Sequence, residues 1–130
     1  MKLYLVRHAE AVPEDVAGSD ADRWLSARGR EHARGLARLL RDERVELDAI
    51  VSSPLPRAVQ TAELLAAGLD YLGPIAIDAA LAPGCHPRRA IDALATRGLA
   101  VAVVGHEPTL AMLGALVMGR PAFPAFRTAQ

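Results

Sequence analysis

The sequence predicts an α/β fold, a single-domain three-layer α/β/α sandwich with a mainly parallel sheet. Strand-like and helix-like segments alternate four times along the chain, with short connections between them. The strand-like runs are continuously apolar, as in VAVV at 101–104, which is typical of strands that helices cover on both faces. A chain of 130 residues has room for one domain of ordinary size. We therefore expect residues 1–130 to form one domain.

The first half of the chain begins with an apolar, β-favouring run over residues 2–7, which predicts a buried first strand. Residues 8–25 contain several Ala and Asp residues together with a Gly and a Pro, which predicts a loop. Ser26 is a suitable N-cap for a helix that continues to about Arg44. One face of this helix is apolar, and it is formed by Ala33, Leu36, Ala37 and Leu40.

The next strand is predicted over residues 48–52, and a helix follows it. Either Pro54 or Pro56 fits the first turn of that helix, and Gly68 fits its end. Residues 74–77 are the third predicted strand.

The last elements follow the same alternation. A helix is predicted over residues 88–97, with Gly98 as its stop signal. LAVAVVGH at 99–106 is the strongest strand of the chain. Pro108 opens a final helix that is apolar nearly all round but only about 11 residues long, well below the roughly 20 that crossing a bilayer requires. We expect this helix to be buried in the core or at a contact with a second subunit, which would make the protein a homodimer.

Composition excludes several classes of partner. Fifteen basic and fifteen acidic residues cancel, so no global field favours nucleic acid or an anionic membrane, and any anion site must be local. Cys85 is the single cysteine, which excludes an internal disulfide and a cysteine-rich zinc site and fits a reducing, cytoplasmic location. The apolar stretch at the N-terminus is too short for a signal sequence. We expect no metal and no cofactor.

Three polar residues follow the predicted strands. His8 follows the first strand, Arg57 lies just after the second in the first turn of its helix, and His106 follows the fourth. Ligands of parallel sheets bind at the carboxyl ends of the strands, so we expect these side chains to gather at one edge. A tetrahedral dianion would be suited by two arginines, Arg7 and Arg57, and by the free backbone amides at the start of a helix. A neutral imidazole is also a competent nucleophile near neutral pH.

Three motifs at these positions resemble those of a known family. LVRHAEA around His8, SSPLPRAVQTAELL at 52–65 and VVGHEPTL around His106 are similar, in order and separation, to the motifs of the histidine phosphatase superfamily, also called the phosphoglycerate mutase-like superfamily. Within it, the small size and the segments RHAEA, RWLSARG and GHEP resemble SixA-like phosphohistidine phosphatases. The resemblance covers residues 1 to about 114.

The resemblance implies a role for each matching residue. It implies that His8 takes the phosphoryl group, that Arg7 and Arg57 bind its oxygens, and that His106 completes the site. Arg23 would contribute from the loop, although a solvated loop residue is an equal interpretation. Apart from the resemblance, Glu107 beside His106 is interpreted either as accepting a hydrogen bond or orienting the substrate, or as an acidic residue that starts the helix. Water would then hydrolyse the phosphohistidine intermediate. The substrate would be a protein that carries phosphohistidine, or a small phosphorylated molecule.

The chain departs from the superfamily in the region where many members carry an acid that protonates the leaving group. No carboxylate lies between Asp78 and Asp92, which leaves Glu10, Glu107 and His86 as candidates. Phosphohistidine needs such an acid least, because its imidazole departs neutral when the other ring nitrogen already carries a proton. A non-catalytic phosphate-binding module and a sugar phosphatase or mutase are the alternative functions.

A second departure is at the end of the chain, where members of this group continue into another strand and further structure. Either the chain is truncated, or residues 122–130 supply an edge strand or an arm that packs on a neighbouring molecule. Pro121 and Pro124 argue against a central strand there. Ser53 lacks the context of a nucleophilic serine, and we interpret it as a capping or turn residue.

Overall fold

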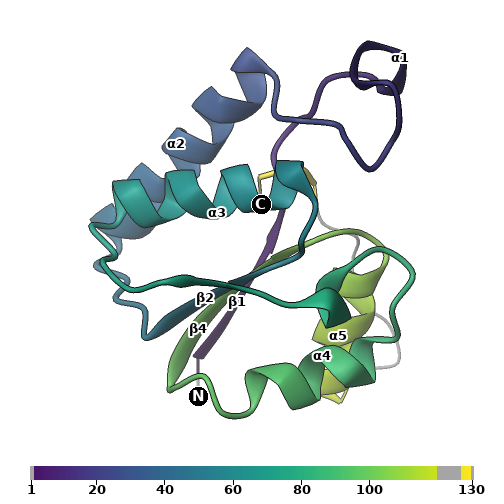
Figure 1. Ribbon diagram of the computed structural model, residues 1–130. Coiled ribbons are helices and arrows are strands. Elements are labelled where there is room, and N and C mark those ends of the chain that lie inside the picture. Colours follow the sequence, from purple (N-terminus) through teal and green to yellow (C-terminus); the bar gives the residue numbers. More distant parts are fainter. Residues whose placement is uncertain (1, 120–126, 130) are drawn as a thin grey trace.

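The computed structural model describes residues 2–119 and 127–129 and contains a four-stranded parallel sheet in the order β1-β4-β2-β3 (Figure 1). The strands are β1 (Lys2–Arg7), β2 (Ala49–Ser52), β3 (Ile75–Ile77) and β4 (Ala100–Gly105). The helices are α1 (Glu14–Ala17), α2 (Ala27–Asp42), α3 (Pro56–Gly68), α4 (Pro87–Leu94) and α5 (Thr109–Met118), with a 3-10 turn η1 (Ala79–Leu81). The predicted three-layer α/β fold is confirmed.

Helices α2 and α3 cover one face of the sheet, and α4 and α5 cover the other (Figure 1). On the first face Ile50 and Val104 pack against α2 and α3 residues, including Ala37 and Leu65. The second face is formed by Val51, Val101, Val103, Leu81, Ala90, Leu94, Leu110 and Leu113. Neighbouring residues of one strand thus enter different layers, which explains why the strands are apolar without alternation.

Local sequence signals set most of the helix ends. The Ser26 hydroxyl accepts a hydrogen bond from the Gly29 amide at 3.0 Å and so caps α2, as predicted. Pro56 begins α3, and Gly68 ends it at a close approach to Ala37 of α2 that leaves no room for a Cβ atom. The predicted buried face of α2 is only partly correct, because Ala33 and Ala37 are buried whereas its two leucines are half-buried.

Two segments differ from the prediction. The short helix α1 lies inside the predicted loop at 8–25, where Pro13 and several polar residues concealed a single helical turn. Helix α4 ends at Leu94 rather than at residue 97, because Leu94 is its last buried residue and residues 95–98 are exposed. Exposed residues beyond that point gain no packing energy from continuing the helix.

Part of the C-terminal segment also lies within the structure. The predicted edge strand or arm at 122–130 falls mostly outside the described residues, which include only 127–129 of it. Within that stretch the Ala129 amide donates to the Arg7 carbonyl oxygen at 3.0 Å, directly at the end of β1. Among the described residues no helix is both long enough and apolar enough to cross a membrane.

The connections define where a ligand is expected. Helix α2, which comes after β1 and the short α1, packs on one face of the sheet, whereas α5, which follows the neighbouring strand β4, packs on the other. Adjacent strands whose connections leave in opposite directions open a crevice at their carboxyl ends. His8 and His106 are the first residues after these two strands.

Candidate active site

The carboxyl edge of the sheet aligns three residues that come from distant parts of the chain. Backbone hydrogen bonds extend the ladder one residue past each strand, from the His8 amide to Gly105 O at 3.1 Å and from the Ser53 amide to Val104 O at 2.9 Å. His106 follows Gly105 directly. These bonds place His8, His106 and Ser53 side by side at the crevice.

The ring of His8 is fixed by its own backbone. His8 is 7% exposed, and its Nδ1 lies 2.7 Å from the Ala9 carbonyl oxygen. A carbonyl oxygen can only accept, so Nδ1 carries the proton and Nε2 keeps its lone pair. The Ala9 amide donates to the Thr61 hydroxyl at 3.0 Å, and that hydroxyl donates to Arg57 O at 2.7 Å. Helix α3 therefore holds the segment that orients His8.

Both histidines are held neutral. Burial, aided by the charges of Arg57 and Arg7, lowers the pKa of His8 to about 4, although the hydrogen bond to Ala9 opposes the shift. The pKa of His106 falls to about 3, because of burial first, then the positive charge that His8 carries once it is protonated, and then the charge of Arg57. The two ring centroids are 5.1 Å apart. At neutral pH the crevice therefore contains two uncharged imidazoles.

Arg57 is the most deeply placed cation of the site. It is 5% exposed, donates from Nη1 to the Asp20 carbonyl oxygen at 2.7 Å, and donates from Nη2 to the Asp20 carboxylate at 3.2 Å. Its Nε is buried and has no hydrogen-bond partner within the part of the chain that the structure describes. A buried guanidinium with an unused N–H is suited to an anionic ligand.

The loop before α2 adds a second guanidinium. Arg23 donates from Nη1 to the other Asp20 oxygen at 3.1 Å and from Nε to the Val12 carbonyl oxygen at 2.7 Å. The pKa of the Asp20 carboxyl is lowered, first by the hydrogen bond from Arg23 and then by the charge of Arg57. Asp20 is therefore ionised at neutral pH and links the two arginines.

These groups surround a cavity of about 300 Å³. Its lining consists of Arg7, His8, Glu10, Ala11, Asp20, Arg23, Arg57, Pro83, His106, Glu107 and Thr128. A volume of this size suits a phosphoryl group with part of its leaving group, and the charge of the three arginines suits an anion. No three potential ligands among His, Cys, Asp and Glu converge as a metal site within 2–119 and 127–129.

The structure brings all six site residues predicted from the sequence to this cavity: Arg7, His8, Arg23, Arg57, His106 and Glu107. Of the candidate proton donors, Glu10 and Glu107 also line it. His86 does not, because it is the N-cap of α4 and its Nδ1 accepts from the Arg88 amide at 3.2 Å.

Sequence reasoning missed three residues that organise the site. Asp20 lies in a loop of several acidic residues, and nothing in the pattern separates it from Asp22. Thr61 gave a signal that we did not use, since it follows Arg57 by four residues and so shares its helix face. Ser53 is bound to the Leu55 amide at 3.2 Å, as a turn residue would be, but it also contacts His106 Nε2 at 2.7 Å.

Comparison with protein families decides the class of this site. The model of the histidine phosphatase superfamily (branch 1) matches residues 3–82, which include His8, Arg23 and Arg57. The chain belongs to this superfamily. Its members are hydrolases of the phosphatase type, and the resemblance found in the sequence motifs is confirmed.

Individual relatives point to one group within the superfamily. A protein of Picosynechococcus sp. is 33% identical over 118 residues, or 85% of this chain and 68% of the relative. The phosphohistidine phosphatase SixA of Escherichia coli K12 is 29% identical over 133 residues, or 98% of this chain and 81% of SixA. A structure of the protein histidine phosphatase SixA with tungstate has a TM-score of 0.91 at 27% identity, over 99% of this chain and 84% of that one. The chain is therefore SixA-like.

Proposed function

We propose that this phosphatase hydrolyses phosphohistidine in proteins and that His8 is the nucleophile. The observation that carries the proposal is the contact of His8 Nδ1 with the Ala9 carbonyl oxygen at 2.7 Å. It leaves the Nε2 lone pair free on a residue that lines an arginine-rich cavity. The low pKa of His8, about 4, keeps that lone pair available at neutral pH.

In the first step His8 Nε2 attacks the phosphorus, and the P–N bond of the substrate breaks as the new P–N bond forms. The substrate imidazole takes the bonding electrons and departs neutral, because its other nitrogen carries a proton. Arg57, Arg7 and Arg23 neutralise charge on the phosphoryl oxygens, and the neutral His106 adds a hydrogen bond. Positioning and charge stabilisation are the main requirements of phosphoryl transfer.

In the second step water attacks the phosphorus of phosphorylated His8. The P–N bond breaks, the water oxygen becomes part of inorganic phosphate, and the released proton goes to the phosphate or to solvent. His8 departs neutral, since Nδ1 retains its proton on the Ala9 carbonyl oxygen. The same hydrogen bond thus makes His8 a nucleophile in the first step and a neutral leaving group in the second.

The carboxylates of the cavity support a phosphoramidate rather than an ester. Asp20 is ionised by its arginine partners, and Glu10 accepts a hydrogen bond from Ser26 at 2.9 Å. Between η1 and α4 the lining residue is Pro83, which carries no proton to donate. An alkoxide leaving group needs a proton donor, whereas a protonated phosphoimidazole does not.

One observation favours a second candidate, a phosphatase of small phosphoesters. Glu107 lines the cavity, and its Oε1 is buried without a hydrogen-bond partner among the described residues. A carboxyl group in this position could protonate an ester oxygen.

A substrate panel separates the two functions. We expect the purified protein to release phosphate from a phosphohistidine peptide at least about a hundredfold faster, in kcat/KM, than from a phosphoserine peptide or a sugar phosphate. Activity should survive EDTA. Comparable rates on a sugar phosphate, lost in Glu107→Gln, would support the second candidate instead. Binding of the phosphohistidine peptide without turnover would indicate a phosphate-binding module.

A further inference from the structure

The other hydrogen bonds of Ser53 determine which group donates in the hydrogen bond between Ser53 and His106. Ser53 is 0% exposed and His106 is 4% exposed, and Ser53 Oγ lies 2.7 Å from His106 Nε2. The serine oxygen already accepts a hydrogen bond from the Leu55 amide at 3.2 Å. Its single proton is therefore available for one acceptor.

Within the described residues, His106 Nε2 is the partner of Ser53 Oγ that can accept this proton. If Nε2 carried a proton instead, the buried hydroxyl would keep a donor without an acceptor, which is costly. The imidazole is neutral and has one proton to place. That proton must then be on Nδ1.

The other ring nitrogen, Nδ1, is buried and has no hydrogen-bond partner among residues 2–119 and 127–129, and His106 lines the cavity together with Arg57. An N–H directed at a phosphoryl group stabilises an anionic oxygen, whereas a lone pair repels it. The tautomer that satisfies Ser53 is therefore also the tautomer that a phosphoryl group requires.

We propose that Ser53 is a positioning residue whose hydroxyl donates to His106 Nε2, fixes the Nδ1–H tautomer, and so presents an N–H to a phosphoryl oxygen. The last step rests on the proposed function, which places the phosphoryl group in this cavity. His8 and His106 then share one tautomer but use opposite ends of the ring. In His8, Nδ1–H donates to the Ala9 carbonyl oxygen and the Nε2 lone pair faces phosphorus. In His106, the Nε2 lone pair accepts from the Ser53 hydroxyl and Nδ1–H donates to a phosphoryl oxygen.

NMR of protein labelled with ¹⁵N-histidine tests the tautomer directly. In the wild type we expect His106 to show a protonated Nδ1 and an unprotonated, hydrogen-bonded Nε2 at pH 7. Ser53→Ala should shift the His106 signals toward a tautomer mixture. The matched control is Ser52→Ala, because Ser52 is also 0% exposed but donates to the Ser53 carbonyl oxygen at 2.9 Å and, in the described structure, makes no hydrogen bond to His106. That variant should leave the tautomer unchanged.

Kinetics supply a second readout. The value of kcat/KM on the phosphohistidine peptide should fall roughly three- to tenfold in Ser53→Ala, the range expected for one hydrogen bond. Ser53→Thr, which retains the hydroxyl, should recover most of the loss together with the wild-type tautomer. Should the alanine variant fail to fold, Ser53→Cys replaces it, because a thiol of similar size is a much weaker donor.

Each outcome decides for or against the inference. A wild-type His106 protonated at Nε2, or a tautomer that neither Ser53→Ala nor Ser53→Cys changes, overturns it without any need for turnover. Titration with inorganic phosphate separates it from the proposed function. Shifts at both His8 and His106 Nδ1 support it, and a shift at His8 alone refutes the role of His106 Nδ1. If neither signal moves, the cavity does not bind phosphate, and the proposed function fails as well as this last step.

Discussion

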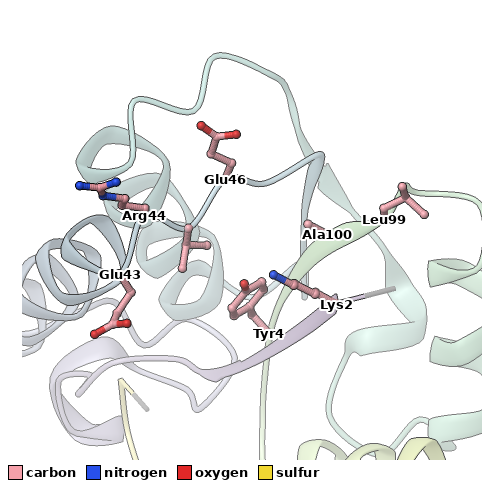
Figure 2. Close-up of a pocket in the computed structure, with 8 residues that line it drawn as sticks. Lys2, Tyr4, Glu43, Arg44, Glu46, Leu99 and Ala100 are labelled. Carbon is pink, nitrogen blue, oxygen red and sulfur yellow. The ribbon is translucent and has the colours of Figure 1, made fainter.

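The two ends of the sheet each carry a cavity, and they differ in what they bury. The cavity at the amino end has a volume of about 490 Å³, and its lining includes Lys2, Tyr4, Glu43, Arg44, Glu46 and Leu99. Figure 2 shows the charged ends of Glu43, Arg44 and Glu46 pointing away from one another. These three side chains belong to exposed residues, so water satisfies them.

The carboxyl end has the smaller cavity, of about 300 Å³, but it gathers the buried polar groups. In the described part of the chain, the buried polar and charged residues lie at the end of a strand, just after one, or in the first two turns of the next helix: His8, Ser52, Ser53, Arg57, Thr61, His106 and Thr109. Burial of such groups is costly unless each has a partner. The functional end of the sheet is therefore distinguished by the free-energy cost of burying its polar groups and not by the volume of its cavity.

Replacement of the proposed nucleophile, His8, is expected to have the largest effect on activity. We expect His8→Ala to lower kcat at least about a thousandfold, because the variant lacks the lone pair that forms the covalent intermediate in the proposed mechanism. His32→Ala is the matched control, since His32 is an exposed imidazole on α2. The measurement is phosphate release, together with trapping of the phosphorylated enzyme at acid-quenched time points. Turnover that persists in His8→Ala would contradict the assignment of the nucleophile.

The forked shape of Arg57 is the next test. Arg57→Lys keeps the charge but loses the planar fork that reaches both Asp20 and an anion, and we expect kcat/KM to fall about a hundredfold. Arg34→Lys is the control, because Arg34 pairs with Glu31 at 2.6 Å on the exposed face of α2. Equal effects of the two substitutions would show that the cavity has no special need for the guanidinium.

Much of this carboxyl end could be predicted from the sequence, because its residues follow strongly patterned strands. His8 and His106 come directly after such strands and Arg57 lies in the first turn of the helix after another, and a parallel sheet brings those strand ends together. Asp20 could not be predicted, because its role depends on how the loop at 8–25 folds back onto α3. The amide of Leu25 donates to Gln60 Oε1 at 2.8 Å, a contact between residues 35 positions apart that no local pattern encodes.

The link made by Asp20 can be tested against its neighbour. Asp20→Asn removes the charge between Arg23 and Arg57, and we expect kcat/KM to fall roughly three- to tenfold, mainly through a higher KM, because both guanidiniums lose a charged acceptor. Asp22→Asn is the control, since Asp22 bonds only to Ser19 in the described structure. A lower KM in Asp20→Asn would instead show that the carboxylate competes with the substrate for the arginines.

The buried imidazoles should also make stability depend on pH. Their pKa values, about 4 and about 3, lie below the unfolded value of 6.5, so the unfolded chain binds more protons below pH 6.5. The free energy of unfolding should therefore decrease as pH falls from 6.5 toward 4, and at pH 5.5 the decrease should be about 1 kcal/mol for each histidine. Urea unfolding at pH 7.5 and 5.5 measures this. A His8→Gln/His106→Gln variant should lose less stability over that range than the wild type, and His32→Gln should lose the same amount.

The smallest effect is expected at the amino end. A double variant, Lys2→Ala/Arg44→Ala, removes two cations from the larger cavity, yet kcat/KM should change less than twofold. The side chains concerned are exposed, and β1 and β4 separate them from His8 and His106 by the whole length of the sheet. Phosphate-release kinetics at two salt concentrations would measure it. A larger loss of kcat/KM that disappears in high salt would mean that the charges at the amino end attract the substrate over a distance. Both ends would then contribute to activity, the carboxyl end by direct contact with the substrate and the amino end by long-range attraction.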